Sequence, residues 1–240
     1  MTLELKLSRS GIEQHIRCPR CFYLQRKLGL KPPASIPLTL AVAVDALLKN
    51  EFDAVRATGG SHPLWQRENL NVRAFQHENI DLWRSNFKGM RITHESGAVI
   101  YGAVDDIWEN LDTQELHIVD YKSTSKAEDP DLNSGFGEGY KRQMEIYQWL
   151  FRQAGFTVSP VGYFLYVNGS KQGSFYKEGT EGFMKFKTTL IPYTGNDDWV
   201  ASSVNNVIKC YLSNALPESG NDCDSCRYYE ERRRVDSNTG

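Results

Sequence analysis

The run Leu116-His-Ile-Val-Asp-Tyr-Lys-Ser123 decides how this chain is expected to fold. Its apolar part is typical of a buried β-strand, and the strand ends with Asp120 and Lys122 two residues apart. Because side chains alternate along a strand, both project from the same face, where they can share one phosphate or one water molecule. An Asp-x-Lys tripeptide is common by chance, so its meaning depends on the surrounding chain.

The segments around this run predict an α/β protein. Residues 98–108 and 115–122 are expected to form a hairpin around the polar turn 110–114. Further strands are predicted over 161–167, 175–176 and 183–193, the first two paired through a turn at Asn168-Gly169. Helices are predicted over 8–28 with a break near Pro19, 38–56, parts of 64–88, 139–154, and 197–212 with Asp197 or Asp198 as cap.

The length and composition are those of a folded globular protein. A chain of 240 residues can form one large α/β domain or two small ones, and we favour a single domain over 1–240 with a flexible tail at 236–240. No apolar run approaches the length of a membrane span, and the N-terminus lacks the apolar core of a signal peptide, so a soluble, cytoplasmic protein without a membrane partner is expected. The net charge of -2 argues against general coating of nucleic acid but permits a local basic groove.

A second acidic residue lies where it can meet the first. Asp105 ends the stretch Tyr101-Gly-Ala-Val-Asp105, and pairing of the two predicted strands brings it close to Asp120. Two neighbouring carboxylates repel unless a cation lies between them, and oxygen ligands suit magnesium or manganese. Gln143 and Tyr147 are four residues apart on the following helix and therefore point the same way.

These pieces together resemble a known family. Their order and gaps resemble PD-(D/E)XK nucleases of the RecB type, in the motifs Gly102-x-x-Asp105, Asp120-Tyr121-Lys122 and Gln143-x-x-x-Tyr147. Cys18-Pro near the start and Cys223-x-x-Cys226-x-Tyr228 near the end resemble the CRISPR-associated RecB-like exonucleases. The resemblance implies a restriction-endonuclease-like core, in which helices flank a central mixed β-sheet.

The resemblance also implies roles for the residues. Asp105, Asp120 and the backbone carbonyl of Tyr121 would hold a divalent ion, and Lys122 would position or activate the attacking water. Family members often place a histidine on the helix ahead of this core, whereas the matching position here is Asp45. An aspartate can still bind the metal, but this departure bears on the mode of cleavage.

The function that follows is a metal-dependent DNA nuclease. It would act on ends or single strands in repair, recombination or foreign-DNA processing, with a restriction-like endonuclease as the nearest rival. The alternative of another class is a nucleic-acid-binding module that keeps the scaffold but does not cut. No Gly-x-x-x-x-Gly-Lys-Ser/Thr motif occurs, so any unwinding requires a partner. A helicase or an integrase-type protein is expected as a protein partner.

Four of the five cysteines form two Cys-x-x-Cys pairs, Cys18 with Cys21 and Cys223 with Cys226. Two such pairs can complete one tetrahedral metal site, which would join the segments 1–35 and 197–234. The related nucleases commonly hold a four-iron cluster with one N-terminal and three C-terminal cysteines, whereas here Cys21 replaces the missing third one. The resemblance favours an iron–sulfur cluster and the double pair favours zinc; the cluster is preferred. Cys210 is expected to be a buried small apolar residue.

Basic and aromatic residues alternate near these cysteines. Basic side chains follow phosphates and aromatic rings stack on bases, so the region can lead single-stranded DNA towards the metal. The other interpretation is a solvated helix face whose aromatic residues pack against the metal centre. The basic residues are Arg17, Arg20, Arg26, Lys27, Arg227 and Arg232 to Arg234, and the aromatic ones are Phe22, Tyr23, Tyr228 and Tyr229.

Overall fold

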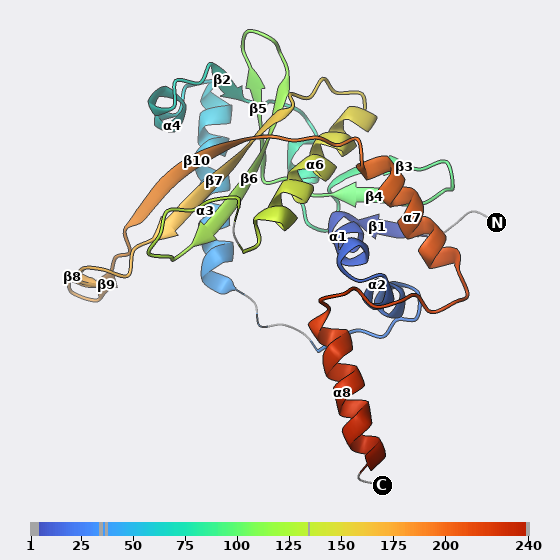
Figure 1. Ribbon diagram of the computed structural model, residues 1–240. Coiled ribbons are helices and arrows are strands. Elements are labelled where there is room, and N and C mark those ends of the chain that lie inside the picture. Colours follow the sequence, from blue (N-terminus) through green and yellow to red (C-terminus); the bar gives the residue numbers. More distant parts are fainter. Residues whose placement is uncertain (1–4, 34–35, 37, 134, 239–240) are drawn as a thin grey trace. The chain divides into compact units, whose positions relative to one another are not determined.

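The computed structural model describes residues 5–33, 36, 38–133 and 135–238. Its elements, shown in Figure 1, fall into two compact units. The cysteine unit comprises Met1–Ile36, Thr93–Ile100 and Asp198–Gly240, and the sheet unit comprises Pro37–Ile92 and Tyr101–Asp197. The single domain over 1–240 stays a prediction. Within the described residues, no helix is both long and apolar enough to cross a membrane.

A mixed five-stranded sheet forms the centre of the sheet unit. The strand order is β10-β7-β6-β5-β2. Only β6 and β7 are parallel, whereas the other neighbouring pairs are antiparallel. The strands are β2 (Val72–Ala74), β5 (Asp106–Asn110), β6 (Leu116–Thr124), β7 (Val161–Gly169) and β10 (Phe186–Thr194). The α/β class with a central mixed sheet is therefore confirmed.

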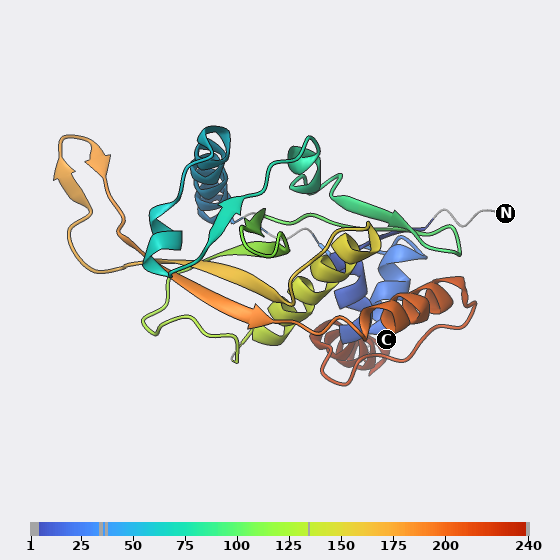
Figure 2. The same cartoon turned by 90° about the horizontal axis from the view of Figure 1, so that it is seen from above.

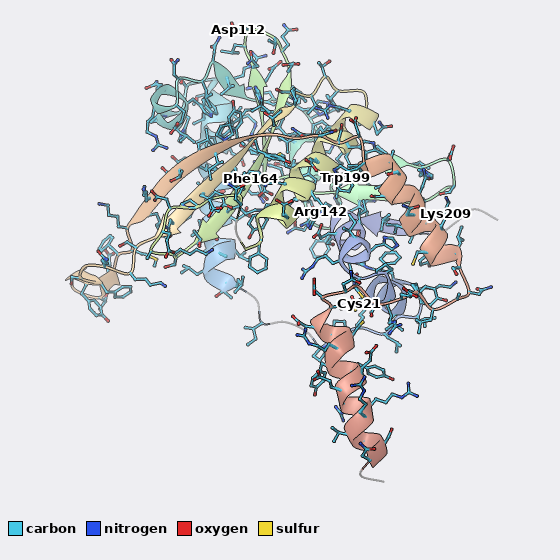
Figure 3. The ribbon with its side chains drawn as sticks, viewed as in Figure 1. Cys21, Asp112, Arg142, Phe164, Trp199 and Lys209 are labelled. Carbon is cyan, nitrogen blue, oxygen red and sulfur yellow. The ribbon has the colours of Figure 1, made fainter. Side chains whose placement is uncertain are left out.

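Helices cover both faces of this sheet (Figure 2). The helix α3 (Thr39–Thr58) packs Phe52 against a core that includes Val119 and Tyr121. The helix α6 (Gly137–Gln153) connects β6 to β7 on the opposite face of the sheet. Figure 3 labels Phe164 of β7, whose ring lies 6.5 Å from that of Tyr140 on α6. Strand alternation then directs the even-numbered residues of β6 towards α6. Two short helices complete the unit, α4 (Pro63–Arg67) and α5 (Ile80–Trp83).

Several predicted strands differ in their bounds or partners. The predicted strand 98–108 is two strands, β4 (Val99–Gly102) and β5, separated by residues 103–105. The predicted pairing of 175–176 with 161–167 is wrong, because β10 pairs with β7 along nine residues. The connection between them instead carries its own small hairpin of β8 (Tyr176–Glu178) and β9 (Glu181–Gly182). The strand β2 was not predicted within 64–88.

The cysteine unit is mainly helical. Its elements are β1 (Lys6–Ser8), α1 (Arg9–Arg17), α2 (Pro19–Arg26), α7 (Val200–Leu212) and α8 (Asp224–Asn238), and the hairpin of β3 (Met90–Thr93) and β4 carries the chain between the units. The break near Pro19 is confirmed, since Cys18 is extended and Pro19 begins α2, where its missing N–H is not needed.

The start of the helix α7 differs from expectation. Trp199, not Asp197 or Asp198, is the N-cap residue of α7, and its side chain makes no capping hydrogen bond. Asp197 instead pairs with Arg152 at 2.6 Å. The flexible tail at 236–240 stays a prediction: α8 extends to Asn238, and residues 239–240 lie outside the described ones.

Candidate active site

The hairpin of β5 and β6 brings the two predicted carboxylates together. Its register pairs Asp106 with Val119, so Asp105 lies beside Asp120 just before β5 begins. The backbone N–H of Tyr121 donates to Oδ2 of Asp105 at 2.7 Å. Because the N–H and C=O of one strand residue point to the same side, the carbonyl of Tyr121 also faces the side where Asp105 lies.

Residues of α6 complete a polar network around Asp120. The Nε2 atom of Gln143 donates to Oδ1 of Asp120 at 2.6 Å and to the hydroxyl of Tyr147 at 3.2 Å. Lys122 pairs with Oδ2 of Asp120 and lies 3.4 Å from Oε1 of Gln143. Asp120 is fully buried, so its charge is balanced inside the site, where Lys122 pairs with its Oδ2.

Gly102 is required by the close packing of α6. A Cβ atom there would lie 2.7 Å from Cε1 of Tyr147 and 3.1 Å from Cδ1 of Leu150. Only glycine lets the chain pass this close to the helix just before Asp105. The spacing Gly102-x-x-Asp105 therefore has a steric basis in this structure.

The electrostatics of the site favour an added cation. Burial is the largest cause that raises the pKa of Asp105 to about 7, and the neighbouring Asp120 is the second. Lys122 and Lys49 oppose this shift. Burial lowers the pKa of Lys122, but Asp120 and Asp105 outweigh it and raise this pKa overall, so the ammonium group stays charged. Since 24% of the Asp105 side chain is exposed, a cation from solvent can reach it.

Lys49 is a residue of the site that the sequence did not single out. Its Nζ lies 2.9 Å from Oδ2 of Asp45, one helical turn earlier on α3, and 3.7 Å from Oδ1 of Asp105. Lys49 thus links Asp45 to the site. The i, i+4 spacing of Asp45 and Lys49 was the signal that could have found it.

The oxygen ligands suit a hard divalent ion that keeps part of its hydration shell. Among the described residues, the group of three or more His, Cys, Asp or Glu ligands is that of the four cysteine sulfurs, so the aspartates form no closed cage. Magnesium usually binds through one or two carboxylates and retains several waters. The donor set of Asp105, Asp120 and the Tyr121 carbonyl fits that requirement.

Comparison with known proteins identifies the family. The family model of the PD-(D/E)XK nuclease superfamily matches residues 37–230. The chain belongs to this superfamily. The match contains every predicted residue of the acidic site and the pair Cys223 and Cys226, but not Cys18 or Cys21. No curated protein matches the chain. PD-(D/E)XK proteins are typically metal-dependent nucleases, so this is a nuclease domain with a nucleic-acid substrate.

A second residue of the candidate site that the sequence did not single out is Tyr140. The Nζ atom of Lys122 lies 4.3 Å from the centre of its ring. Tyr140 precedes Gln143 by three residues and so shares its face of α6, which was the available signal. It also lines a cavity of about 420 Å³ beside Lys122, together with Phe136, Tyr166 and Lys126.

The adjacent acidic residue Asp106 has a different environment. It is fully buried, pairs with Arg56 of α3, and accepts hydrogen bonds from the Ile107 N–H at 2.8 Å and the Tyr121 hydroxyl at 3.0 Å. Burial raises its pKa, and Arg56 opposes this effect. Asp106 therefore ties α3 to the sheet, whereas Asp105 faces Asp120.

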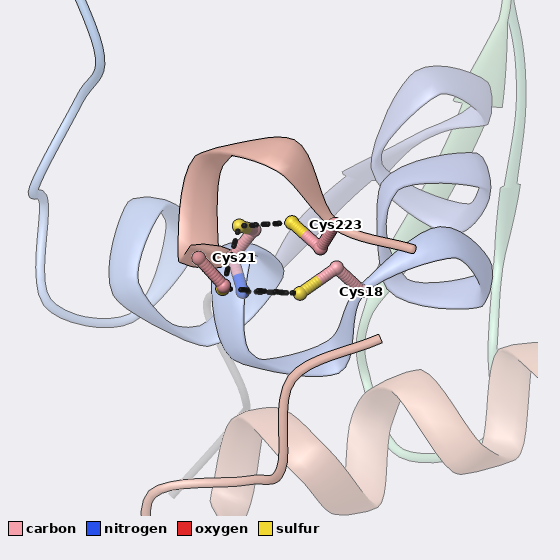
Figure 4. A group of neighbouring side chains, drawn as sticks. Cys18, Cys21 and Cys223 are labelled. Atoms are coloured by element: carbon pink, nitrogen blue, oxygen red, sulfur yellow. Dashed lines mark hydrogen bonds between the residues drawn. The ribbon is translucent and has the colours of Figure 1, made fainter. Parts of the chain in front are cut away.

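The four predicted cysteines meet in the cysteine unit (Figure 4). Their sulfurs all lie within 4.8 Å of one another, and no disulfide joins them. Burial raises the pKa of Cys18, but N–H donors from Gly220 and Cys21 outweigh it and lower this pKa to about 7. Cys210 lies outside the group and is partly exposed, so the prediction that it is a buried residue is wrong.

The basic segment of the cysteine unit is largely engaged in local contacts. Phe22 and Tyr23 are buried, so they are not free to stack on bases, whereas Tyr228 and Tyr229 are exposed. Local partners hold Arg20 (Glu230 and the Pro217 carbonyl), Lys27 (the Ser213 carbonyl and the Tyr23 ring) and Arg227 (Asp224). Arg17 and Arg26 are exposed. Nucleic-acid binding by this segment stays a prediction.

Proposed function

We propose that the chain is a magnesium- or manganese-dependent DNA nuclease that hydrolyses phosphodiester bonds. The observation that carries the proposal is the hydrogen bond from the Tyr121 N–H to Asp105, which sets the Tyr121 carbonyl and both carboxylates around one edge of β6. The proposed ligands are Asp105, Asp120 and the Tyr121 carbonyl, and Lys122, Gln143 and Tyr147 act beside them.

The roles follow from charge and position. A bound divalent ion would lower the pKa of its water and offset charge on the phosphate. Lys122, which keeps its proton, supplies a positive donor to the phosphate and holds the attacking water near it. Gln143 fixes Asp120 and lies within reach of Lys122, and it accordingly acts as a positioning residue.

We further propose that the substrate is single-stranded DNA or DNA with free ends, as the resemblance to RecB-type enzymes implies. The cavity beside Lys122 supports this substrate, because an exposed aromatic ring at Phe136, the ring of Tyr140 and the exposed Lys126 line it. Unpaired bases stack on aromatic rings and phosphates pair with lysine. Processing of DNA in repair, recombination or foreign-DNA handling, with a helicase or integrase-type partner, belongs to the same proposal.

Cleavage of four labelled DNAs tests the proposal. The substrates are single-stranded and duplex DNA, each in linear and circular form, incubated with manganese. The proteins are wild type, Asp120→Asn and the control Asp112→Asn, whose side chain lies in the exposed turn after β5 (Figure 3). We expect wild type and Asp112→Asn to degrade linear single strands and Asp120→Asn to be inactive. Loss of linear DNA without cutting of circular DNA would indicate an exonuclease, and cutting of circular DNA would indicate an endonuclease. Equal activity of all three proteins would remove the proposal.

A second candidate is a nucleic-acid-binding module that does not cut. The pairing of Lys49 with Asp45 and Asp105 favours it, since the lysine partly neutralises these carboxylates without a metal. This candidate predicts tight DNA binding, no uptake of manganese by calorimetry, and the same DNA affinity in wild type and Asp120→Asn. Metal uptake with cleavage excludes it. Charge reversal of Arg17 and Arg26 would show whether these exposed residues contribute to DNA binding.

A further inference from the structure

The spacing of the four cysteine sulfurs distinguishes between two kinds of metal centre. The Sγ atoms of Cys21 and Cys223 lie 3.4 Å apart, those of Cys18 and Cys226 3.7 Å, and those of Cys21 and Cys226 3.7 Å. The remaining pairs also lie within 4.8 Å. Each of the two Cys-x-x-Cys turns contributes two sulfurs, and the turns are about 200 residues apart in the chain.

We propose that Cys18, Cys21, Cys223 and Cys226 hold a single zinc ion as a structural centre. Zinc binds four thiolates tetrahedrally at about 2.3 Å, and the edge of that tetrahedron, the sulfur–sulfur distance, is about 3.8 Å. The three distances above are close to this edge. The double Cys-x-x-Cys spacing is also that of zinc ribbons.

The four-iron cluster implied by the family resemblance does not fit these positions. In such a cluster each thiolate binds a different iron, and sulfides separate the irons, so the thiolate sulfurs lie roughly 6 Å apart. Every sulfur pair here is closer than 4.8 Å. The four sulfurs enclose room for one ion and not for four irons with their sulfides.

The backbone around Cys18 is built to hold a thiolate in this closed arrangement. The N–H groups of Gly220 and Cys21 lie 3.2 and 3.4 Å from its Sγ, and such donors offset the negative charge that four thiolates leave on a zinc site. A Cβ on residue 220 would lie 2.0 Å from the carbonyl oxygen of Arg17. Gly220 is therefore the residue that allows this N–H to reach the sulfur.

A site with four protein ligands has no open position for substrate. The centre therefore joins α2 to the start of α8 within the cysteine unit and takes no part in the chemistry. Its presence and the nuclease proposal can be tested separately, because no aspartate of the sheet unit contributes a ligand.

The test uses the full chain, produced with both iron and zinc supplied and purified without oxygen. Metal analysis and the visible spectrum are recorded for wild type, Cys223→Ser and Cys210→Ser, the last removing the one cysteine outside the group. We expect about one zinc and no iron per chain in wild type and Cys210→Ser, and at least about fivefold less zinc in Cys223→Ser. Zinc exchanged for cobalt should give the spectrum of tetrahedral cobalt with four sulfurs.

Two outcomes would overturn the zinc centre. One is about four irons per chain with the broad visible absorption of an iron–sulfur cluster, either as purified or after anaerobic treatment with iron and sulfide. The other is a zinc content equal to that of wild type in both single variants, Cys223→Ser and Cys18→Ser. If Cys223→Ser does not fold, X-ray absorption of wild type decides the question, since the proposal requires four sulfur neighbours around zinc at about 2.3 Å. Loss of DNA cleavage without a change in metal content does not bear on the zinc centre.

Discussion

The backbone N–H of Tyr121 donates a 2.7 Å hydrogen bond to the carboxylate of Asp105. Asp105 precedes the first residue of β5, beyond the last backbone pairing of β5 with β6. The hydrogen bond through its side chain continues the contact between the two segments. Protein contacts therefore contribute to the arrangement of the acidic site. Variants that remove its charges should therefore change chemistry more than folding.

Asp120→Asn should abolish cleavage, a loss of at least about 10²-fold, because it removes one anionic ligand. The fold should survive, since the amide keeps the shape of the side chain and Asp105 remains to balance Lys122. We expect the melting temperature of the metal-free protein to change by less than about 3 °C. A manganese cleavage time course and calorimetry check this, with Asp112→Asn as control.

Lys122→Met should keep metal binding but slow cleavage by about 10² to 10³, as expected when one donor to the transition state is removed. The unchanged ligands explain the retained metal affinity. Calorimetric titration with manganese and single-turnover cleavage separate the two effects, and Lys88→Met, on an exposed residue, is the control. Weak metal binding in Lys122→Met would contradict the assigned role.

Gly102→Ala should lower both stability, by about 1–3 kcal/mol, and cleavage, because the new Cβ collides with Tyr147 and moves α6. Urea unfolding measures the first effect. In a Tyr147→Leu background the same substitution should cost less, since the ring atom that it meets is gone. An equal cost in both backgrounds would disprove the steric explanation.

The pKa of Asp105, raised to about 7, predicts a pH dependence of stability. Its unfolded value is about 3.9, so between these values the folded state binds a proton that the unfolded state lacks, and stability falls as pH rises through this window. We expect metal-free wild type to lose about 2–3 kcal/mol more than Asp105→Asn between pH 5 and pH 8. Urea unfolding with a chelator at both pH values tests this, and the same slope in both proteins would contradict it.

Asp106→Asn should destabilise the protein by about 3 kcal/mol, because it leaves Arg56 without its buried counter-charge. Asp81→Asn is the matched control: this carboxylate pairs with Arg84 but is 88% exposed, so its loss should change stability by less than about 0.5 kcal/mol. Thermal and urea unfolding compare the two. If folded Asp106→Asn binds manganese as tightly as wild type, the result would agree with a structural role of Asp106.

The sequence determined the elements whose signals are local. Residue type, spacing and turn chemistry predicted three of these elements: the break of the first helix at Pro19, the long helix over 38–56, and the run ending in Asp120 and Lys122. The order of the acidic, lysine and glutamine motifs likewise sufficed to identify the superfamily. These features depend on periodicity along the chain, and a linear sequence carries that periodicity directly.

Only the tertiary structure decided which distant segments meet. Three features depend on contacts between residues of different elements: the pairing of β7 with β10, the position of Lys49 between Asp45 and Asp105, and the distances between the four cysteine sulfurs. Local turn signals at Asn168-Gly169 favoured a nearer partner, yet the nine-residue ladder with β10 replaced it, because tertiary pairing overrides a single turn preference. Spacing in sequence likewise left zinc and iron–sulfur open, since the geometry of a metal site depends on distances that folding alone sets.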